Sequence, residues 1–418
     1  MSQQEQLAIV GGRPLRGRLR ASGSKNAALY ALAAALLTAE PVRLHNVPEI
    51  RDIGEMGRLI ESLGGEVTID GGDVTLDAGG ITETTAAPEH VVALRASFLV
   101  MGPLLARFGE AGCPSPGGDA IGVRPVDVHL AGFRSLGAEV AREGPNFVAR
   151  APRLEGSRVF LDYPSVLGTV NVLFAATLAR GTTTIVNAAA EPEVEMAGDL
   201  LNAMGARVSG HGSSRITVGG VESLHGAEFS IIPDRIEGGT FLLAGLATGG
   251  DVELEGAEPT HMDSLLTKLR EAGARVEVSD HSVRACVDGP LRAVQLQAVP
   301  YPGFPTDLHA PMAAALTQAE GISIIHERVF ENRLLYVGEL RTMGGRITTG
   351  GQSVIIEGPT PLVGSPVRAL DVRAAAAVVI AGLAAEGETV VRDIVHLKRG
   401  YPRIEERLEA LGAEVHAR

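Results

Sequence analysis

Helix-length apolar runs of two kinds follow one another along the chain. Some are apolar on nearly every face, and a helix without a polar face has to be buried on all sides. Others, at 55–63 and 264–271, carry polar residues on one face and are expected nearer the surface. The runs that predict buried helices are 26–37, 171–178, 240–247, 311–316 and 373–383.

Short segments rich in β-branched residues lie between these helices. Examples are 183–185, 323–325 and 389–391, and a further strand is expected at 7–10. Strands that alternate with helices in this way predict an α/β fold.

A glycine that follows an apolar residue and precedes a small one ends a helical run six times, each time just before a strand segment. A glycine in this place is typical of a helix C-terminus. Successive copies lie 68 to 73 residues apart, so the chain is predicted to contain six repeats of a βαβαββ unit. The glycines are Gly64, Gly137, Gly205, Gly273, Gly344 and Gly412.

The repeats also predict the domain organisation. A chain of 418 residues is too long for one ordinary core, so two domains of three repeats each are expected. With buried helices inside and sheets outside, this is a two-domain inside-out α/β barrel. The first domain is predicted over 24–232 and the second over 1–23 plus 233–418, completed by the strand at 7–10. The cleft between them is the predicted ligand site.

A glycine-rich segment at 109–124 lengthens the second repeat. Its five glycines and two prolines predict an irregular loop there, and such loops are usually functional or disordered. The segment carries Asp119 and ends at Arg124, before a helix that Pro125 can open. Taken alone, an Asp among glycines is more typical of a turn.

Composition favours a cytoplasmic enzyme, with 45% hydrophobic and 21% charged residues. The longest apolar run, 374–385, is too short for a membrane span of about 20 residues, and the first residues do not predict a secretory signal. Cys113 and Cys286 have neither disulfide-framework nor metal-ligand spacing. No metal, no cofactor and no membrane partner are therefore expected, and the oligomeric state stays open.

The net charge of −13 argues against a nucleic-acid partner, because phosphate backbones attract basic surfaces. An anionic ligand would need a local cluster of cations, which the starts of the repeats offer. Lys25 lies at the start of a buried helix, where a helix N-terminus can hold an anion, although a plain Ser or Asn cap is an equal interpretation. Further cations in such places are Arg95, Arg124, Arg235, Arg333, Arg373 and Arg399.

Asp307 is the acidic candidate of the second half. It runs directly into the helix that begins near 308. Taken alone, this position is more typical of a helix N-cap than of a catalytic group.

Motifs along nearly the whole chain resemble those of one family. They read SGSKNAAL, LRAS, PGG-IG-RPVD-H, NAA-EPE, PDRIE-GTF, FPTD, VFENR and RGY-RIE. The chain is similar to the UDP-N-acetylglucosamine 1-carboxyvinyltransferases, the enolpyruvyl transferases that open peptidoglycan synthesis. The related 5-enolpyruvylshikimate-3-phosphate synthases share the six-repeat fold but not RPVD-H or VFENR.

The resemblance implies the reaction and its substrates. The 3-hydroxyl of UDP-N-acetylglucosamine adds to C-2 of phosphoenolpyruvate while C-3 is protonated, and phosphate then leaves the tetrahedral intermediate. Catalytic roles are implied for Asp119, Asp307, Lys25 and Arg399, with Asp307 as the base on the sugar hydroxyl. Phosphoenolpyruvate would contact Lys25, Asn26, Arg124, Arg373 and Arg399. The nucleotide sugar would contact Arg95, Arg124, Pro125, Val126, Asp127, Val128, Ser165, Val166, Asp307 and Val329.

The chain departs from the family at the loop. Most members carry a cysteine where this chain has Asp119, and Cys113 lies too early to replace it. An Asp with an ordinary pKa of about 3.9 is ionised at neutral pH, so donating a proton there requires a shift of about 3, or roughly 4 kcal/mol. Loop closure over a phosphate supplies such a shift, or else the proton arrives through the substrate phosphate. The epoxide antibiotic fosfomycin, which alkylates the family's cysteine, is predicted not to inactivate this chain.

Further departures leave alternatives open. Leu167 stands where a glycine is usual beside the nucleotide, His309 replaces a glutamine, and Lys398 replaces an acid. One alternative is a transferase acting on the shikimate-pathway acceptor. Another is a non-catalytic nucleotide-sugar-binding paralogue, motivated by Asp119 and Leu167.

Overall fold

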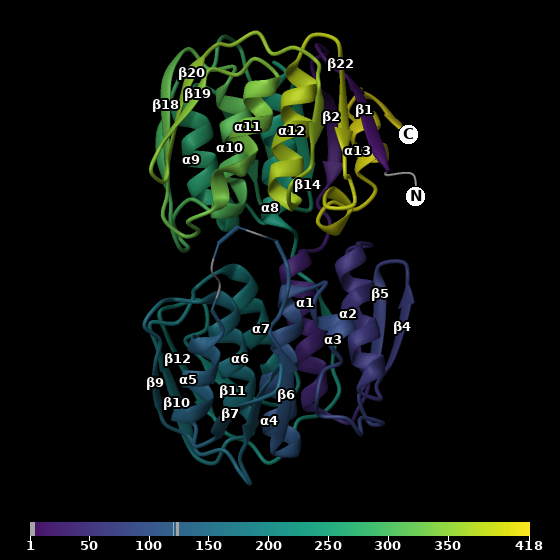
Figure 1. The fold of residues 1–418 in the computed structure, drawn as a ribbon, viewed down its shortest axis with the longest axis vertical. Coiled ribbons are helices and arrows are strands. Elements are labelled where there is room, and N and C mark those ends of the chain that lie inside the picture. Colours follow the sequence, from purple (N-terminus) through teal and green to yellow (C-terminus); the bar gives the residue numbers. More distant parts are fainter. Residues whose placement is uncertain (1–4, 120, 123–124) are drawn as a thin grey trace. The chain divides into compact units, whose positions relative to one another are not determined.

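The computed structural model describes residues 5–119, 121–122 and 125–418. These residues form two compact units (Figure 1). The N-terminal unit contains 23–119 and 125–232, and the C-terminal unit contains 5–22, 121–122 and 233–418.

The described part of the N-terminal unit contains three sheets. Each has its strands in an order that differs from their order in the chain. The first is β13 (Glu228–Ser230), β3 (Val42–His45), β5 (Asp73–Asp77) and β4 (Glu66–Asp70). The second is β6 (Glu110–Pro114), β8 (Asn146–Arg150) and β7 (Glu139–Glu143). The third is β11 (Arg207–Ser209), β12 (Arg215–Gly219), β10 (Thr182–Val186) and β9 (Arg158–Phe160).

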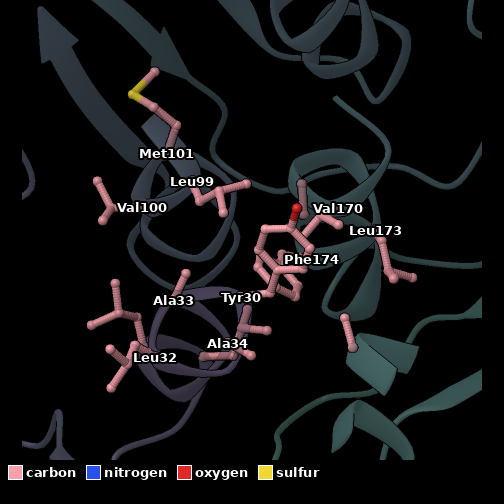
Figure 2. Packing of buried hydrophobic residues seen from close by; sticks show 14 of the residues in the cluster. Tyr30, Leu32, Ala33, Ala34, Leu99, Val100, Met101, Val170, Leu173 and Phe174 are labelled. Atoms are coloured by element: carbon pink, nitrogen blue, oxygen red, sulfur yellow. The ribbon is translucent and has the colours of Figure 1, made fainter. Parts of the chain in front are cut away.

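Buried helices form the core of this unit. They are α1 (Lys25–Ala34), α4 (Met101–Phe108) and α6 (Val166–Thr177), and the α1 and α6 runs confirm the predicted all-round apolar helices at 26–37 and 171–178. Figure 2 shows Tyr30, Leu99 and Phe174 gathered in one cluster from three helical segments. The remaining helices are α2 (Arg51–Ser62), α3 (Pro88–Val91), α5 (Asp127–Ser135) and α7 (Pro192–Ala203).

The C-terminal unit also contains three sheets within its described residues. The first is β15 (Arg275–Ser279), β16 (Ser282–Cys286), β14 (Asp251–Glu255) and β2 (Arg16–Arg20). The second is β17 (Gln295–Ala298), β18 (Gly321–Glu327), β20 (Ser353–Gly358) and β19 (Ile347–Gly350). The third is β21 (Pro366–Arg368), β22 (Glu388–Arg392), β1 (Gln6–Val10) and β23 (Glu414–Ala417). The strand predicted at 7–10 is thus confirmed as β1, which pairs with β22 and β23.

Three buried helices pack on one another in the core of the C-terminal unit, where Figure 1 shows them side by side. They are α8 (Arg235–Ala247), α10 (His309–Leu316) and α12 (Val372–Ala384). Their residues are apolar and mostly small, so the helix backbones approach closely. The outer helices are α9 (Asp263–Glu271), α11 (Tyr336–Thr342) and α13 (Ile404–Ala410).

The six repeat glycines end helices as predicted. Each has a positive φ, from 87° at Gly412 to 102° at Gly64. At Gly137 the amide donates to the carbonyl of Arg134, and the next amide, of Ala138, donates to Phe133. The same two hydrogen bonds recur at the other five glycines, which makes every one a Schellman motif.

The prediction of an irregular segment from 109 to 124 is wrong over its first part. Glu110–Pro114 forms β6, paired antiparallel with β8. Gly112 permits close contact with a neighbouring segment, because a Cβ there would lie 2.6 Å from the Oγ1 of Thr85. The glycines thus serve the sheet as well as the loop that follows, and Arg124 lies outside the described residues.

Candidate active site

Lys25 begins α1 in the N-terminal unit. The cap of that helix is Ser24, whose Oγ accepts from the amide of Ala27 at 3.4 Å, so the Ser cap and the cation occur together. Lys25 is 9% exposed, and its Nζ lies 2.7 Å from the carboxylate of Asp52, which is 1% exposed. A buried ion pair of this kind fixes the position of its ammonium, because either charge alone would be costly to bury. The neighbouring Asn26 is half-buried.

Arg95 opens a 3-10 helix, η2 (Arg95–Val100), that leads into α4, so the expected buried helix begins one element later. Its Nη1 donates to the carbonyl of Pro116 at 3.4 Å, which joins Arg95 to the segment that carries Asp119. Asp119 itself is half-buried and follows β6 without regular structure.

The buried side-chain amide of Asn171, in α6, joins that helix to η2, α4 and α5. Asn171 of α6 donates through Nδ2 to the carbonyl of Phe98 at 2.8 Å and to Nδ1 of His129 at 3.0 Å. Its Oδ1 accepts from the amide of Gly102 at 2.7 Å. Burial, reinforced by the charge of Arg95, lowers the pKa of His129 to about 3, so the ring is neutral. The network fixes η2 and α4 relative to α5.

Six of the residues expected at the nucleotide sugar lie at or just before the starts of α5 and α6. Ser165 caps α6, with its Oγ accepting from the amide of Gly168 at 3.2 Å. A Cβ on Gly168 would lie 2.8 Å from Val128 and 3.0 Å from Ser165 Oγ, so Val128 and Ser165 flank one glycine. The exposed Asp127 begins α5, and Val126 precedes it. The other members of this group are Pro125, which is exposed, and Val166, which begins α6.

Asp307 belongs to the C-terminal unit and is not a helix cap. It lies inside the short 3-10 helix η4 (Thr306–Leu308), whose N-cap position is Pro305, so the N-cap interpretation is wrong. Its Oδ2 accepts from Nε and Nη2 of Arg373 at 3.0 and 2.7 Å, and its Oδ1 accepts from Nη2 of Arg333 at 2.7 Å. Burial alone would raise the pKa of Asp307, but the charges of Arg373 and Arg333 outweigh it and hold that pKa well below its usual range.

Arg373 is positioned by the start of α12. Asp371 caps this helix, and its Oδ1 accepts from the amide of Arg373 at 2.7 Å. On the other side, Nη1 of Arg373 donates to the hydroxyl of Tyr401 at 3.3 Å, and that hydroxyl lies 3.0 Å from Oγ1 of Thr240. Arg399 is half-buried and ends η6 (Leu397–Arg399), two residues before Tyr401.

Glu327, at the end of β18, is a site residue that the sequence did not reveal. It is 1% exposed. Its Oε2 accepts from Oγ1 of Thr306 and Nδ1 of His309, both at 2.8 Å. Its Oε1 accepts from the amides of Val329 at 2.7 Å and Phe330 at 3.2 Å. One carboxylate therefore ties the segment of Asp307 to that of Val329.

Sequence reasoning also missed Asp52, Asn171 and Tyr401, which hold Lys25, the Arg95 segment and Arg373. The available signal was weak: Asn171 is a polar residue in an apolar run, Asp52 stands beside Arg51 near other charges, and Tyr401 is visible only as part of the motif RGY-RIE. Residues 5–119, 121–122 and 125–418 contain no group of three or more His, Cys, Asp or Glu able to hold a metal ion. Over the same residues, no helix is long and apolar enough to cross a bilayer.

The chain belongs to a family of carboxyvinyltransferases, because the family model described as EPSP synthase (3-phosphoshikimate 1-carboxyvinyltransferase) matches residues 9–408. Its full-length relatives narrow the assignment. The UDP-N-acetylglucosamine 1-carboxyvinyltransferase of Magnetococcus marinus is 46% identical over 98% of this chain and 99% of its own length. A UDP-N-acetylglucosamine 1-carboxyvinyltransferase 2 of Carboxydothermus hydrogenoformans is 49% identical with the same coverage. They confirm the resemblance seen in the motifs.

Solved structures agree on the fold. The enolpyruvyl transferase NikO from Streptomyces tendae superposes with a TM-score of 0.89 at 28% identity, covering 99% of each chain. An EPSP synthase from Acinetobacter baumannii gives 0.76 at 19% identity, over 99% of this chain and all of that one, and supports the fold alone. The mixed α/β fold predicted from the sequence is thereby confirmed.

Proposed function

We propose that this chain transfers the enolpyruvyl group of phosphoenolpyruvate to the 3-hydroxyl of UDP-N-acetylglucosamine and releases phosphate, in the first committed step of peptidoglycan synthesis. The observation that carries the proposal is identity of 45–49% over 98% of the chain to four relatives that bear the name of this activity. The reaction needs no redox chemistry, and its substrates belong to the cytoplasm.

In the proposed mechanism, Asp307 accepts the proton of the sugar 3-hydroxyl as that oxygen bonds to C-2 of phosphoenolpyruvate. C-3 gains a proton, delivered by Asp119 or through the substrate phosphate. The C-2 to phosphate bond of the tetrahedral intermediate then breaks, and loss of a proton from C-3 restores the double bond. Fixed cations stabilise the anionic groups throughout. Those cations are Lys25, Arg124, Arg373 and Arg399, with Asn26 beside them.

The proposed binding of the nucleotide sugar uses the starts of α5 and α6. Val128 and Ser165 flank Gly168, so the two helix starts form one surface for the ligand. Arg95 is a further proposed contact, and its guanidinium donates to the carbonyl of Pro116. From the C-terminal unit, Asp307 and Val329 are the proposed contacts, joined through Glu327.

We further propose that each unit is an inside-out α/β barrel of three βαβαββ repeats, with the active site in the cleft between residues 24–232 and residues 1–23 plus 233–418. Supporting this are the three sheets and the buried central helices that each unit has within its described residues. The repeated Schellman glycines give the same six-fold division.

Phosphate release from phosphoenolpyruvate tests the function. We expect release only when UDP-N-acetylglucosamine is also present, and none with shikimate 3-phosphate as the acceptor. Release with shikimate 3-phosphate instead would establish the shikimate-pathway alternative. Tight binding of the nucleotide sugar without any phosphate release would identify a non-catalytic paralogue. This is the alternative hypothesis that Asp119 and Leu167 suggest.

A further inference from the structure

Asp307 is held in a state that does not suit a base. Its carboxylate accepts three hydrogen bonds from two arginine side chains, at 2.7 to 3.0 Å. Arg333 and Arg373 are 4% and 6% exposed, so both cations are buried, whereas the Asp307 side chain is 26% exposed. A carboxylate stabilised by two buried cations has little tendency to take a proton from an alcohol.

The arrangement around Arg373 shows which of the two pairs can change. Apart from Asp307, the guanidinium donates to the neutral hydroxyl of Tyr401 at 3.3 Å. Asp371 engages its backbone amide, not its side-chain charge. Among the hydrogen bonds of the guanidinium, an arriving phosphate or carboxylate would compete with those to Asp307, while Asp234 adds a second nearby negative charge. A doubly charged phosphate competes well.

Arg333 is better placed to remain with Asp307. It lies in η5 (Arg333–Leu335), and its guanidinium also packs near the ring of Phe330, 5.7 Å from the ring centroid. The charged and titratable groups around the pair are thus Arg333, Arg373, Asp234, Tyr401 and, beyond Thr306, the buried Glu327 with His309.

We infer that the Asp307–Arg373 ion pair is a resting-state lock, which the anionic substrate opens by taking the guanidinium of Arg373 and so releases Asp307 to act as the base. This inference rests on the proposed function for the identity of the anion. It orders the events of the reaction: an anion at Arg373 precedes deprotonation of the hydroxyl. In the absence of that anion, Asp307 stays ionised and inert.

The protonation of Asp307 can be followed directly. In protein labelled with carboxyl-¹³C aspartate, the Asp307→Asn variant identifies the Asp307 signal. The signal is followed as a function of pH, and its midpoint reports the protonation of Asp307. We expect saturating phosphoenolpyruvate without acceptor to raise this midpoint by about 1–3 pH units, because that is the effect of losing one neighbouring opposite charge. Inorganic phosphate together with UDP-N-acetylglucosamine, which cannot turn over, is expected to do the same. Sodium chloride at equal ionic strength is expected to leave the Asp307 midpoint unchanged.

Two variants provide the matched comparison. Arg373→Gln is expected to raise the Asp307 midpoint in the absence of any anion. Arg368→Gln, which removes an exposed arginine paired with Asp393, is expected to leave it unchanged. If Arg373→Gln does not fold, the anion titrations of the unmodified protein still decide the question.

The outcomes separate the lock from the proposed function. An unchanged Asp307 midpoint with both anions, with binding checked by calorimetry, overturns the lock and makes Asp307 a permanent anchor for two arginines. Failure of both anions to bind overturns it equally, because the lock requires an anion at Arg373. Phosphate release with both substrates is a separate measurement: a raised midpoint without release supports the lock and contradicts the proposed function.

Discussion

Asp307 and Glu327 are carboxylates of the same unit with different partners, Asp307 partly exposed and Glu327 buried. Asp307 is balanced by two full charges. Glu327 accepts hydrogen bonds from a hydroxyl, an imidazole and two backbone amides, and these hold its pKa below the usual range against the opposing effect of burial. Charge pairs can exchange with an ionic ligand, whereas a carboxylate satisfied by backbone and neutral side chains stays in place. We therefore expect Glu327 to position Asp307 and Val329 without touching substrate.

Replacing Glu327 tests that positioning role. Glu327→Gln keeps the volume but turns one acceptor oxygen into a donor, so hydrogen bonds now accepted by the carboxylate from Thr306 and His309, or from the amides of Val329 and Phe330, are lost or must reverse. We expect the free energy of unfolding to fall by about 2–4 kcal/mol, because hydrogen bonds to a charged acceptor are worth about 1.5–3 kcal/mol each. We also expect kcat to fall by about tenfold or more while the KM for phosphoenolpyruvate changes little, since the cations for that substrate are left in place.

Denaturant unfolding and steady-state kinetics measure both effects. Glu357→Gln, on the neighbouring strand β20 with an exposed partner in Arg346, is the control and should change stability by less than about 0.5 kcal/mol. Glu327→Asp should restore part of kcat. Unchanged kcat in Glu327→Gln would contradict the positioning role even if stability falls.

A second prediction at the residue scale concerns Asp119, which stands where most members of the family carry a cysteine. Burial raises the pKa of the Cys113 thiol, and Cys113 is enclosed in β6, so this thiol is unreactive. We expect fosfomycin to leave the unmodified protein unlabelled and to label Asp119→Cys once per chain, as measured by intact-protein mass spectrometry. An adduct on the unmodified protein would contradict this prediction, and peptide mapping would show whether Cys113 or Cys286 carries it.

At the scale of elements, local signals were readable and distant pairings were not. The six helix-ending glycines could be predicted because a Schellman motif involves only one helix end and the residues beside it. The strand β6 was missed because Gly112 within it and Gly109 just before it are typical of a loop, while its pairing partner β8 lies more than 30 residues away. The same limit applies to the site: the repeat starts revealed Arg373 and Asp307 as candidates, but nothing in their spacing showed that they pair with each other.

The glycine motif supports a prediction with opposite signs at two positions. Gly137 has a φ of 90°, and a Cβ added there would have no atom within 4 Å. The cost of Gly137→Ala therefore comes only from placing an alanine in a left-handed backbone conformation. We expect it to destabilise the protein by about 1–2 kcal/mol. Gly338 also has open space but lies in α11 with helical φ, so Gly338→Ala should stabilise by about 0.5–1 kcal/mol. Denaturant unfolding measures both, and two changes of the same sign would contradict the assignment.

Across the whole molecule, the two units bury titratable groups with opposite pH dependence. In the N-terminal unit, His129 is neutral because burial lowers its pKa to about 3. In the C-terminal unit, burial raises the pKa of Glu237 to about 7, although Arg407 and Ser22 favour its ionised form. An unfolded His takes up a proton below about pH 6.5, so the contribution of His129 is lost as the pH falls through that value toward 3. The contribution of Glu237 is full below about pH 4.5 and is lost as the pH rises toward 7.

Chemical denaturation of variants between pH 4.5 and 7 separates the two groups. We expect His129→Gln to remove an acid-induced loss of up to about 2–3 kcal/mol over this range, because each pH unit across the shift is worth about 1.4 kcal/mol. Glu237→Gln should remove a loss of stability that occurs as the pH rises. The free energy of unfolding of this variant should therefore decline less toward pH 7 than that of the unmodified protein. If the free energy of unfolding changes with pH in the same way in the unmodified protein, His129→Gln and Glu237→Gln, neither group has the shifted pKa that its burial predicts.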